Sequence, residues 1–326
     1  MKCVKVTANA NIALIKYWGK RNEELMLPTK NSLSLTLAAL KTTTTISFNN
    51  TVDCITFGAE NNEQLNNPIS SFLNTVRNLF GIKRHFSIAS TNHFPTASGL
   101  ASSASGFAAL ALGINSLCKL QLNTQEISML ARLGSGSAAR SVYGGIVLWY
   151  KGEALNGNDS YAEQLFDNNW LPDLRILILV TTTHIKKTSS RVGMQQSLQT
   201  SPQYAAWVEQ SENRLHNLIQ AIQKKDLSSI GSLTEADWEG MRDVILTTIP
   251  QLDYWNDASA MIIKTIKKLR QEQDIPCFIT TDAGPHVKII CSAKDVVSIQ
   301  QSLQNIPGII SFLESTLAPA PIIEEL

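Results

Sequence analysis

The segment FPTASGLASSASG, residues 94–106, constrains the fold of this chain more than any other stretch. It follows a β-rich run and leads into an apolar repeat in which Phe107, Leu110 and Ile114 recur at spacings of three and four, so a helix is predicted over 103–119. Small residues at a helix entry let the backbone approach a ligand, and the first helical turn exposes unpaired N–H groups. The segment therefore predicts a helix start that binds an anion such as phosphate, with a plain cap and turn as the alternative.

The other patterns predict an α+β fold, with mixed sheets and helices packed on them. A second helix is expected to begin after Asn123, with Glu126 as its capping-box partner, and to end near Gly134 as the first residue beyond the helix. The apolar run 174–180 is typical of a strand buried on both faces. The second half is richer in helical patterns. The β-rich runs of the first half are 2–8, 32–40, 42–48, 54–58 and 84–91.

The length of the chain predicts two lobes. Its 326 residues exceed the roughly 250–300 residues at which one hydrophobic core stops growing. The predicted division falls just after the buried strand, giving domains 1–181 and 182–326, with a ligand cleft between them.

Composition excludes some partners. Lys and Arg number 28 against 27 Asp and Glu, so no overall field favours nucleic acid or an acidic membrane surface, and an anionic ligand must be held by local geometry. Five scattered cysteines favour reduced thiols and a cytoplasmic protein. The first residues lack the apolar core of a signal peptide, and no run approaches the ~20 apolar residues of a membrane span.

Two polar segments place donors where anions bind. In IKYWGKR, Lys16, Tyr17 and Lys20 bring two ammonium groups and a phenol together at a strand end or turn, although a solvated basic turn is the other interpretation. In GSGSAARS, residues 134–141, backbone and hydroxyl donors precede Arg140, whose planar fork suits a carboxylate. A linker with a surface arginine is the alternative there.

A third segment places an acid at a tight junction. Asp282 lies between the strand-like CFIT and the turn residues Gly284 and Pro285, which fixes the direction of its side chain, although a turn-forming role is the alternative. The five histidines show no metal-ligand spacing, so a zinc site held by the protein is not expected.

Taken together, these segments resemble those of a known family. Residues 94–106 resemble the P-x-x-x-G-L-x-S-S-A phosphate loop of the GHMP small-molecule kinase superfamily. Within it, the sequence resembles the mevalonate diphosphate decarboxylases in further segments that occur in family order and span nearly the whole chain. These are 10–37, 132–145, 186–194 and 281–288; within the last, His286 stands where the family commonly has Asn.

The resemblance implies a GHMP-kinase-like two-lobed fold with the active site in the cleft, and it assigns roles to residues. Asp282 would orient or deprotonate the C3 hydroxyl, Arg140 would hold the C1 carboxylate, and Lys16 would support the site. The implied substrate-binding residues are Ala13, Tyr17, Lys20, Ser135, Gly136, Ser137, Arg140, Arg191 and Met194. The implied nucleotide-binding residues are Pro95, Gly99, Leu100, Ala101, Ser102, Ser103, Ser105 and Lys187, with Lys186 near them.

The activity implied by the resemblance is ATP-dependent decarboxylation of mevalonate 5-diphosphate to isopentenyl diphosphate. ATP and Mg²⁺ are the implied cofactors, with the metal carried on the ATP phosphates, and a homodimer is the implied assembly. The alternatives within the superfamily are a phosphomevalonate decarboxylase and a relative that stops at the 3-phosphate. A catalytically silent binding protein is a further alternative, but it would be expected to have lost Asp282 or the 94–106 loop.

Overall fold

The N-terminal half is built on two long antiparallel strands, β1 (Cys3–Ile15) and β4 (Ser32–Asn49), in a computed structural model that describes residues 2–58, 63–94, 102–182 and 187–326. The first half of β1 alternates buried and half-buried residues, because one face of the sheet there is open. From Ala8 onward every residue of β1 is buried, since the second lobe covers the other face. In β4, the two runs predicted separately at 32–40 and 42–48 form one continuous strand.

Five more strands complete a seven-stranded sheet around this pair. The order is β13-β1-β4-β6-β5, and β7 pairs with the other end of β4 and with β8. Among the strand pairs that the structure describes, β5 and β6 alone run parallel. The added strands are β5 (Cys54–Phe57), β6 (His85–Asn92), β7 (Ile146–Trp149), β8 (Ala162–Phe166) and β13 (Ile322–Glu325). A short hairpin of β2 (Lys20–Asn22) and β3 (Leu27–Pro28) lies between β1 and β4 in the sequence.

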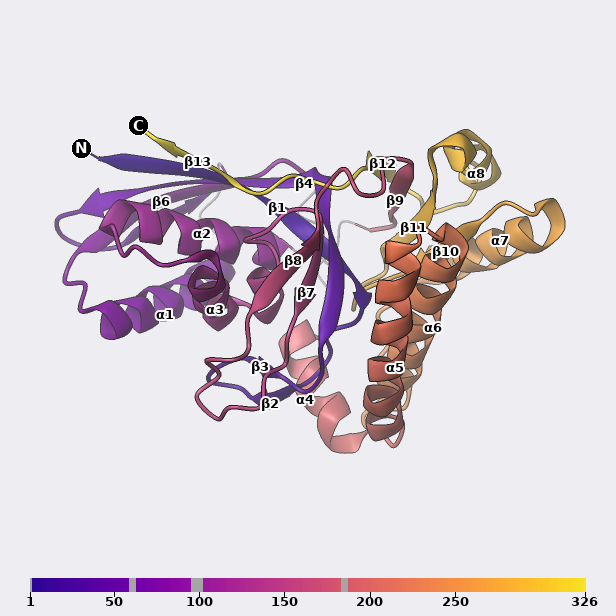
Figure 1. Cartoon of the computed structure of the whole chain (residues 1–326), viewed down its shortest axis with the longest axis horizontal. Coiled ribbons are helices and arrows are strands. Elements are labelled where there is room, and N and C mark those ends of the chain that lie inside the picture. The colour runs from indigo at the N-terminus through magenta and orange to yellow at the C-terminus, as the bar shows by residue number, and fades with distance from the viewer. Residues whose placement is uncertain (1, 59–62, 95–101, 183–186) are drawn as a thin grey trace.

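Three helices cover one face of this sheet (Figure 1). They are α1 (Glu63–Phe80), α2 (Ser102–Cys118) and α3 (Thr124–Gly134). The predicted capping box is confirmed, because Asn123 Oδ1 accepts from Glu126 N at 3.0 Å and Glu126 Oε2 accepts from Asn123 N at 2.7 Å. The helix ends near Gly134 as predicted, but the prediction that this glycine is the first residue beyond the helix is wrong. Gly134 is the last helical residue, and a Cβ there would lie 2.1 Å from Phe107 Cδ1, so packing against α2 requires the glycine.

The second half forms a four-stranded antiparallel sheet covered by helices. Its order is β10-β11-β9-β12. The strands are β9 (Leu174–Val180), β10 (Cys277–Thr280), β11 (Val287–Ser292) and β12 (Ser311–Ser315). The helices are α4 (Ser190–Thr200), α5 (Tyr204–Gln223), α6 (Leu227–Leu246), α7 (Asp257–Gln273) and α8 (Val296–Leu303), with a 3-10 turn at Ala293–Asp295; a second 3-10 turn, Gly136–Ala139, follows α3 in the first half. Within the described chain, no helix has both the length and the apolar character needed to cross a membrane.

Strand β9 is buried on both faces, as its apolar sequence predicts, and it joins the two cores. Ile176 and Ile178 pack in a cluster that also holds Leu14 and Leu35 of the first sheet, whereas Leu177 packs on the opposite side against the C-terminal helices. Because both faces are covered, alternation of polar residues is absent. The α+β, two-lobed fold class predicted from sequence is confirmed.

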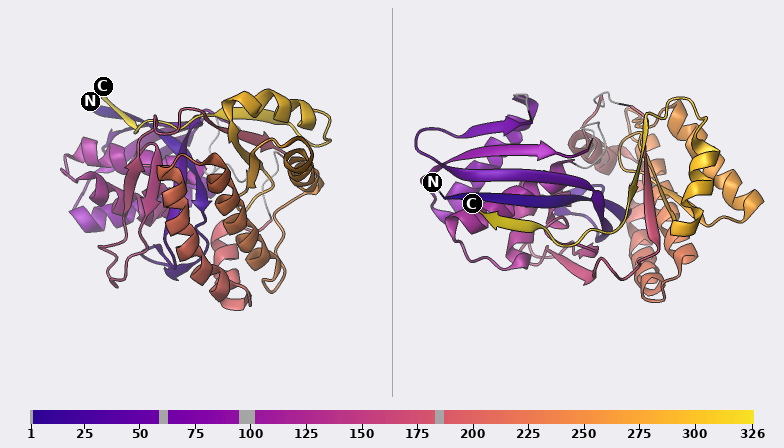
Figure 2. Two further views of the ribbon diagram at one scale, coloured as in Figure 1. Left: turned by 45° about the vertical axis from the view of Figure 1, so that its right-hand side comes forward. Right: turned by 90° about the horizontal axis from the view of Figure 1, so that it is seen from above.

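The two sheets do not follow the order of the chain. Strand β9 pairs with strands that come more than a hundred residues later, and β13 returns to pair with β1, with Val4 opposite Glu325. Figure 2 shows this last strand lying along the N-terminal one. The division at 181/182 stays a prediction.

A buried acid connects the lobes. Asp237 of α6 accepts the backbone N–H of Lys16 at 2.7 Å, and its other oxygen lies 3.5 Å from Lys30 Nζ and 3.7 Å from Arg214 Nη1. Ser211 bridges the lysine and the acid. Asp237 and Lys30 are both almost fully buried, and burial lowers the pKa of Lys30 to about 8. This cluster fixes the chain at the end of β1.

Removing Lys30 should therefore cost stability. Lys30→Met leaves a buried carboxylate short of a partner, and we expect the free energy of unfolding to fall by about 3 kcal/mol or more, measured by urea denaturation at pH 7. Lys267→Met is the matched control, because it removes the half-exposed partner of Glu239 and should cost less than ~1 kcal/mol. Equal losses in the two variants would contradict a structural role for the buried pair.

Candidate active site

A cavity of about 430 Å³ lies where the two lobes meet. Its walls come from the end of β1, the β2–β3 hairpin, the first turn of α2, the segment after α3, the first turns of α4 and the turn after β10. Four of the lining side chains are cationic and one is acidic: Lys16, Lys20, Arg140 and Arg191, and Asp282. The excess of positive charge in a partly enclosed space favours a polyanionic ligand.

The acid of the site is held by two lysines. Asp282 Oδ1 lies 3.3 Å from Lys16 Nζ, and Oδ2 lies 3.4 Å from Lys288 Nζ. Both lysine side chains are at most 3% exposed, whereas Asp282 is 30% exposed toward the cavity. Burial opposes ionisation of Asp282, but the two ammonium groups outweigh it and hold the pKa of its carboxyl below the usual range. The carboxylate is therefore ionised and fixed in direction.

The guanidinium of Arg140 is buried among neutral partners. It donates to Asn11 Oδ1 at 3.0 and 3.3 Å and to Ser32 Oγ at 2.5 Å, and it lies 5.7 Å from the Trp149 ring. Among the described residues, no carboxylate lies within ion-pair distance of it. Burial lowers the pKa of Arg140 to about 10, which leaves it charged at neutral pH. A buried cation beside a cavity, with no carboxylate at ion-pair distance among the described residues, is suited to an anionic group of a ligand.

A phenol and a glycine face each other on another wall. Tyr17 packs edge-on against Trp149, with centroids 4.8 Å apart, and its buried hydroxyl has no hydrogen-bond partner in the described part of the protein. A Cβ at Gly136 would lie 2.5 Å from that hydroxyl. The glycine therefore leaves room for the phenol, whose O–H is available to a ligand. Burial raises the pKa of Tyr17, so it stays protonated.

A row of hydroxyls lines the same wall. Ser103 Oγ, in the first turn of α2, lies 3.3 Å from Ser135 Oγ, which lies 3.3 Å from Ser137 Oγ. The row thus places the start of α2, for which the sequence predicts phosphate binding, next to the segment that follows α3. Ser105 points away, because it is fully buried and shares a 2.6 Å hydrogen bond with Thr42.

Most of the predicted residues meet at this cavity. Those that line it are Ala13, Tyr17, Lys20, Ser102, Ser103, Ser135, Gly136, Ser137, Arg140, Arg191, Met194 and Asp282. Ser105 and the exposed Lys187 do not line it. Four predicted nucleotide-binding residues lie outside the described residues, as does Lys186: Pro95, Gly99, Leu100 and Ala101. The roles of all these residues stay predictions.

Some residues of the site had no predicted role. Asn11 holds Arg140 and also donates to Ser137 O at 3.0 Å and Ser141 Oγ at 2.8 Å. Lys288 is the second cation at Asp282. Asn11 and Lys288 are polar residues inside apolar strand sequences, and a polar residue in such a position indicates that its side chain has a buried partner. His286 is fully buried, and its Nδ1 accepts Thr181 N at 3.2 Å, so it joins the turn after β10 to the end of β9.

The described residues suit a nucleotide better than a protein-held metal. Ser102 and Ser103 begin a helix at the cavity, and a helix start with hydroxyl donors fits phosphate groups. No group of three or more His, Cys, Asp or Glu side chains able to hold a metal occurs in the part of the chain that the structure describes.

The fold and the cation-rich cavity define an enzyme that binds small polyanionic substrates between two lobes. Residues 8–162 match the family model of the diphosphomevalonate decarboxylase-like N-terminal domain, and residues 176–318 match that of the mevalonate 5-diphosphate decarboxylase C-terminal domain. The chain therefore belongs to the diphosphomevalonate decarboxylase family.

Individual relatives support this assignment. The diphosphomevalonate decarboxylases of Danio rerio and Homo sapiens are each 38% identical to the chain, covering 90% and 91% of it and 77% and 78% of their own lengths. Among solved structures, the mevalonate diphosphate decarboxylase of Enterococcus faecalis is 36% identical, with a TM-score of 0.92 over 100% of this chain and 99% of that one. A structure described as MDDEF in complex with MVAPP, AMPPCP and magnesium is 37% identical, with a TM-score of 0.93 over the same shares.

Lys16 should impose a pH limit on the enzyme. Burial lowers its pKa to about 8, and the charged form is the one that pairs with Asp282. Activity that needs this ammonium is present below that pKa and is lost as the pH rises through it. We expect kcat/KM, which reports the free enzyme, to fall above pH ~8 with mevalonate 5-diphosphate.

Lys16→Arg tests whether Lys16 is the group responsible for the fall in kcat/KM above pH ~8. An arginine stays charged, so the decline near pH 8 should disappear even if the maximal rate is lower. A decline at the same pH in both enzymes would show that another group titrates.

Proposed function

We propose that the chain catalyses the ATP-dependent decarboxylation of mevalonate 5-diphosphate to isopentenyl diphosphate, CO₂, ADP and phosphate. The observation that carries this proposal is the cavity, which combines an ionised, doubly anchored acid with a buried arginine that has no acidic partner among the described residues. The relatives that the chain resembles support it, since they are named for this reaction. The MDDEF complex with MVAPP, AMPPCP and magnesium supports ATP and Mg²⁺ as cofactors.

The diphosphate end of the substrate is assigned to the wall of hydroxyls and cations. Tyr17 offers an unpartnered O–H, Ser135 and Ser137 offer hydroxyls, and Lys20 and Arg191 offer charge. Lys20 already pairs with Glu23, which holds its ammonium on the hairpin. Donors in this number suit two phosphate groups, which favours the 5-diphosphate over the 5-phosphate. Met194 and Ala13 supply apolar contact to the carbon chain.

The reacting end is assigned to Asp282 and Arg140. Asp282 would align the C3 hydroxyl and accept its proton as the γ-phosphoryl group of ATP is transferred to that oxygen. The C3–O bond would then break with loss of phosphate, as the C1–C2 electrons form the new double bond and CO₂ leaves. Arg140 would hold the C1 carboxylate in the conformer that permits this. Bound Mg²⁺ would neutralise charge on the ATP phosphates, near Ser102 and Ser103.

Product analysis tests the function directly. Purified enzyme with Mg-ATP should release CO₂ and ADP in equal amounts from mevalonate 5-diphosphate, and far less from the 5-phosphate or from mevalonate. Release of ADP without CO₂ would instead indicate a 3-kinase, and preference for the 5-phosphate would indicate a phosphomevalonate decarboxylase.

Arg140→Lys separates decarboxylation from simple binding. A lysine keeps the charge but cannot contact Asn11, Ser32 and a carboxylate together, so turnover should fall by about 10²-fold while diphosphate binding is retained. Arg175→Lys, which alters a surface pair with Glu314, is the control and should leave turnover unchanged. Wild-type release of ADP and CO₂ by Arg140→Lys would remove Arg140 from the carboxylate site.

We propose further that the enzyme is a cytoplasmic homodimer. Its five cysteines are free and scattered, which suits a reducing compartment, and the dimer rests on the family resemblance. Light scattering of the purified protein measures the assembly, and a monomeric mass at micromolar concentration would contradict it.

A further inference from the structure

Arg132, in the last turn of α3, is a buried cation that the reaction scheme does not use. It is 3% exposed and is absent from the cavity lining. Within the described residues, its guanidinium donates to main-chain carbonyls alone: Nε to Leu25 O at 3.0 Å, and Nη1 to Gly157 O at 3.0 Å and to Ser160 O. No acidic side chain of the described ranges lies within 4 Å of it. Such a burial is costly, and burial lowers the pKa of Arg132 to about 10.

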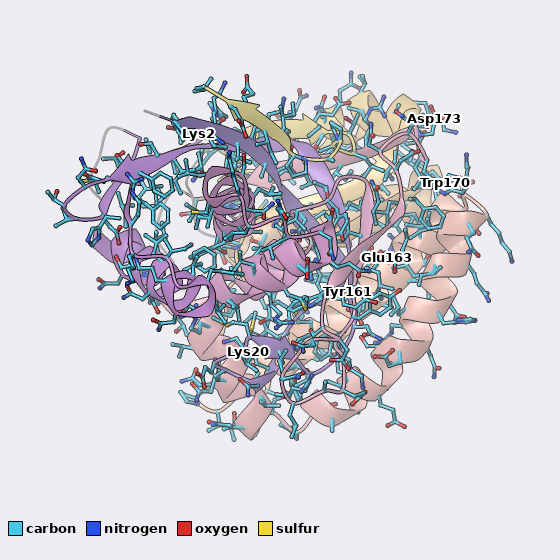
Figure 3. The ribbon with its side chains drawn as sticks, turned by 60° about the vertical axis from the view of Figure 1, so that its left-hand side comes forward. Lys2, Lys20, Tyr161, Glu163, Trp170 and Asp173 are labelled. Carbon is cyan, nitrogen blue, oxygen red and sulfur yellow. The ribbon has the colours of Figure 1, made fainter. Side chains whose placement is uncertain are left out.

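The carbonyls belong to two segments that are far from α3 in the sequence. Leu25 lies in the turn of the β2–β3 hairpin, which carries Lys20 and Met26 to the cavity. Gly157 and Ser160 belong to the loop that connects β7 to β8. Figure 3 labels Lys20 on this hairpin and Tyr161, the last residue of the loop before β8. One guanidinium therefore joins the hairpin, the loop and the end of α3.

All three segments lead to the wall assigned to the diphosphate. Arg132 stands three residues before Ser135. Ser160 Oγ accepts from Trp149 Nε1 at 3.3 Å, and Trp149 packs against Tyr17. Lys20 comes with the hairpin. The elements that carry Tyr17, Lys20, Ser135 and the residues after it are thus joined through Arg132, which is not itself among the residues that line the cavity.

From this arrangement we infer that Arg132 is a positioning residue that sets the geometry of the diphosphate-binding wall, and with it the selectivity for a 5-diphosphate over a 5-phosphate. The inference rests on the proposed function for the identity of the ligand. The fork geometry is essential, because a lysine ammonium at one point cannot reach carbonyls on two separate segments while filling the same space.

Arg132→Lys is the direct test. We expect the KM for mevalonate 5-diphosphate, and its Kd measured by calorimetry without ATP, to rise about tenfold or more through misplacement of the donors. The KM for ATP should stay within about twofold, because α2 is not fastened by Arg132. The ratio of kcat/KM for the 5-diphosphate to that for the 5-phosphate should fall. A residue needed only for stability would shift these parameters together or not at all.

Arg21→Lys is the matched control. Arg21 also donates to three carbonyls of the same loop, those of Lys151, Gly152 and Ala154 at 3.2–3.3 Å, but from the exposed surface. Its loss should leave the KM for the 5-diphosphate unchanged. An equal rise in the two variants would assign the effect to the loop in general and overturn the inference.

A second pair of variants protects the test if Arg132→Lys does not fold. Gly157 has φ +70°, and a Cβ there would lie 2.9 Å from Arg132 Nη2 and 2.6 Å from Leu27, so Gly157→Ala should displace the guanidinium and raise the same KM. Gly152→Ala introduces the same kind of backbone strain, at φ +66°, but its Cβ would contact Asp159 instead of Arg132. This variant should therefore leave the KM for the 5-diphosphate unchanged.

The inference is overturned if folded Arg132→Lys, or Gly157→Ala in its place, keeps the wild-type Kd for mevalonate 5-diphosphate and the wild-type selectivity. It is also overturned if the KM values for ATP and for the diphosphate rise in parallel. Failure of the wild-type enzyme to bind and convert the 5-diphosphate would instead refute the proposed function. This measurement is made on the unmodified protein before any variant, so the two failures are distinguished.

Discussion

The buried carboxylate of Asp237 fixes the end of β1, and the geometry of the cavity depends on that point. One oxygen accepts the backbone N–H of Lys16, and the other faces Lys30. The helix that carries Asp237 belongs to the second lobe, whereas both lysines belong to the first. The contact therefore joins the lobes at the residue whose side chain meets Asp282. Breaking a buried ionic contact is expensive, so the position of Lys16 is set by the packing of the whole protein rather than by its own turn.

The site keeps its charges in two different states before any ligand arrives. Asp282 is matched by two ammonium groups, so it is fixed and ionised. Arg140 donates to the neutral side chain of Asn11, and the hydroxyl of Tyr17 has no hydrogen-bond partner among the described residues. Both side chains are therefore available to interact with the charge of a ligand. Groups held in place by neutral hydrogen bonds need little reorganisation when a ligand charge arrives, which is the condition for strong electrostatic stabilisation in a partly dry site. Acid and cations thus have separate tasks although they share one cavity.

Local patterns in the sequence predicted much of the fold. The periodicity of α2, the capping box of α3 and the apolar run of β9 are local features, and the structure contains them. Gly134 was misinterpreted because its requirement comes from Phe107, 27 positions away, which no local rule contains. Likewise Asp237 lies 221 positions from Lys16, and Asn11 lies 129 from Arg140. Most of the residues to which the resemblance gave a role line the cavity, whereas Asn11 and Lys288 received no role although they lie in the same segments, because their partners Arg140 and Asp282 are brought to them only by the fold.

The pairing of β13 with β1 has a consequence for how the protein is made. On the ribosome, β1 emerges some three hundred residues before β13, the strand that covers its outer edge. Until then β1 presents unpaired backbone groups, and an edge of this kind can recruit a strand from another chain. Vectorial synthesis therefore leaves this edge of β1 uncovered until β13 has emerged, and during that interval a nascent chain is open to aberrant pairing with its neighbours.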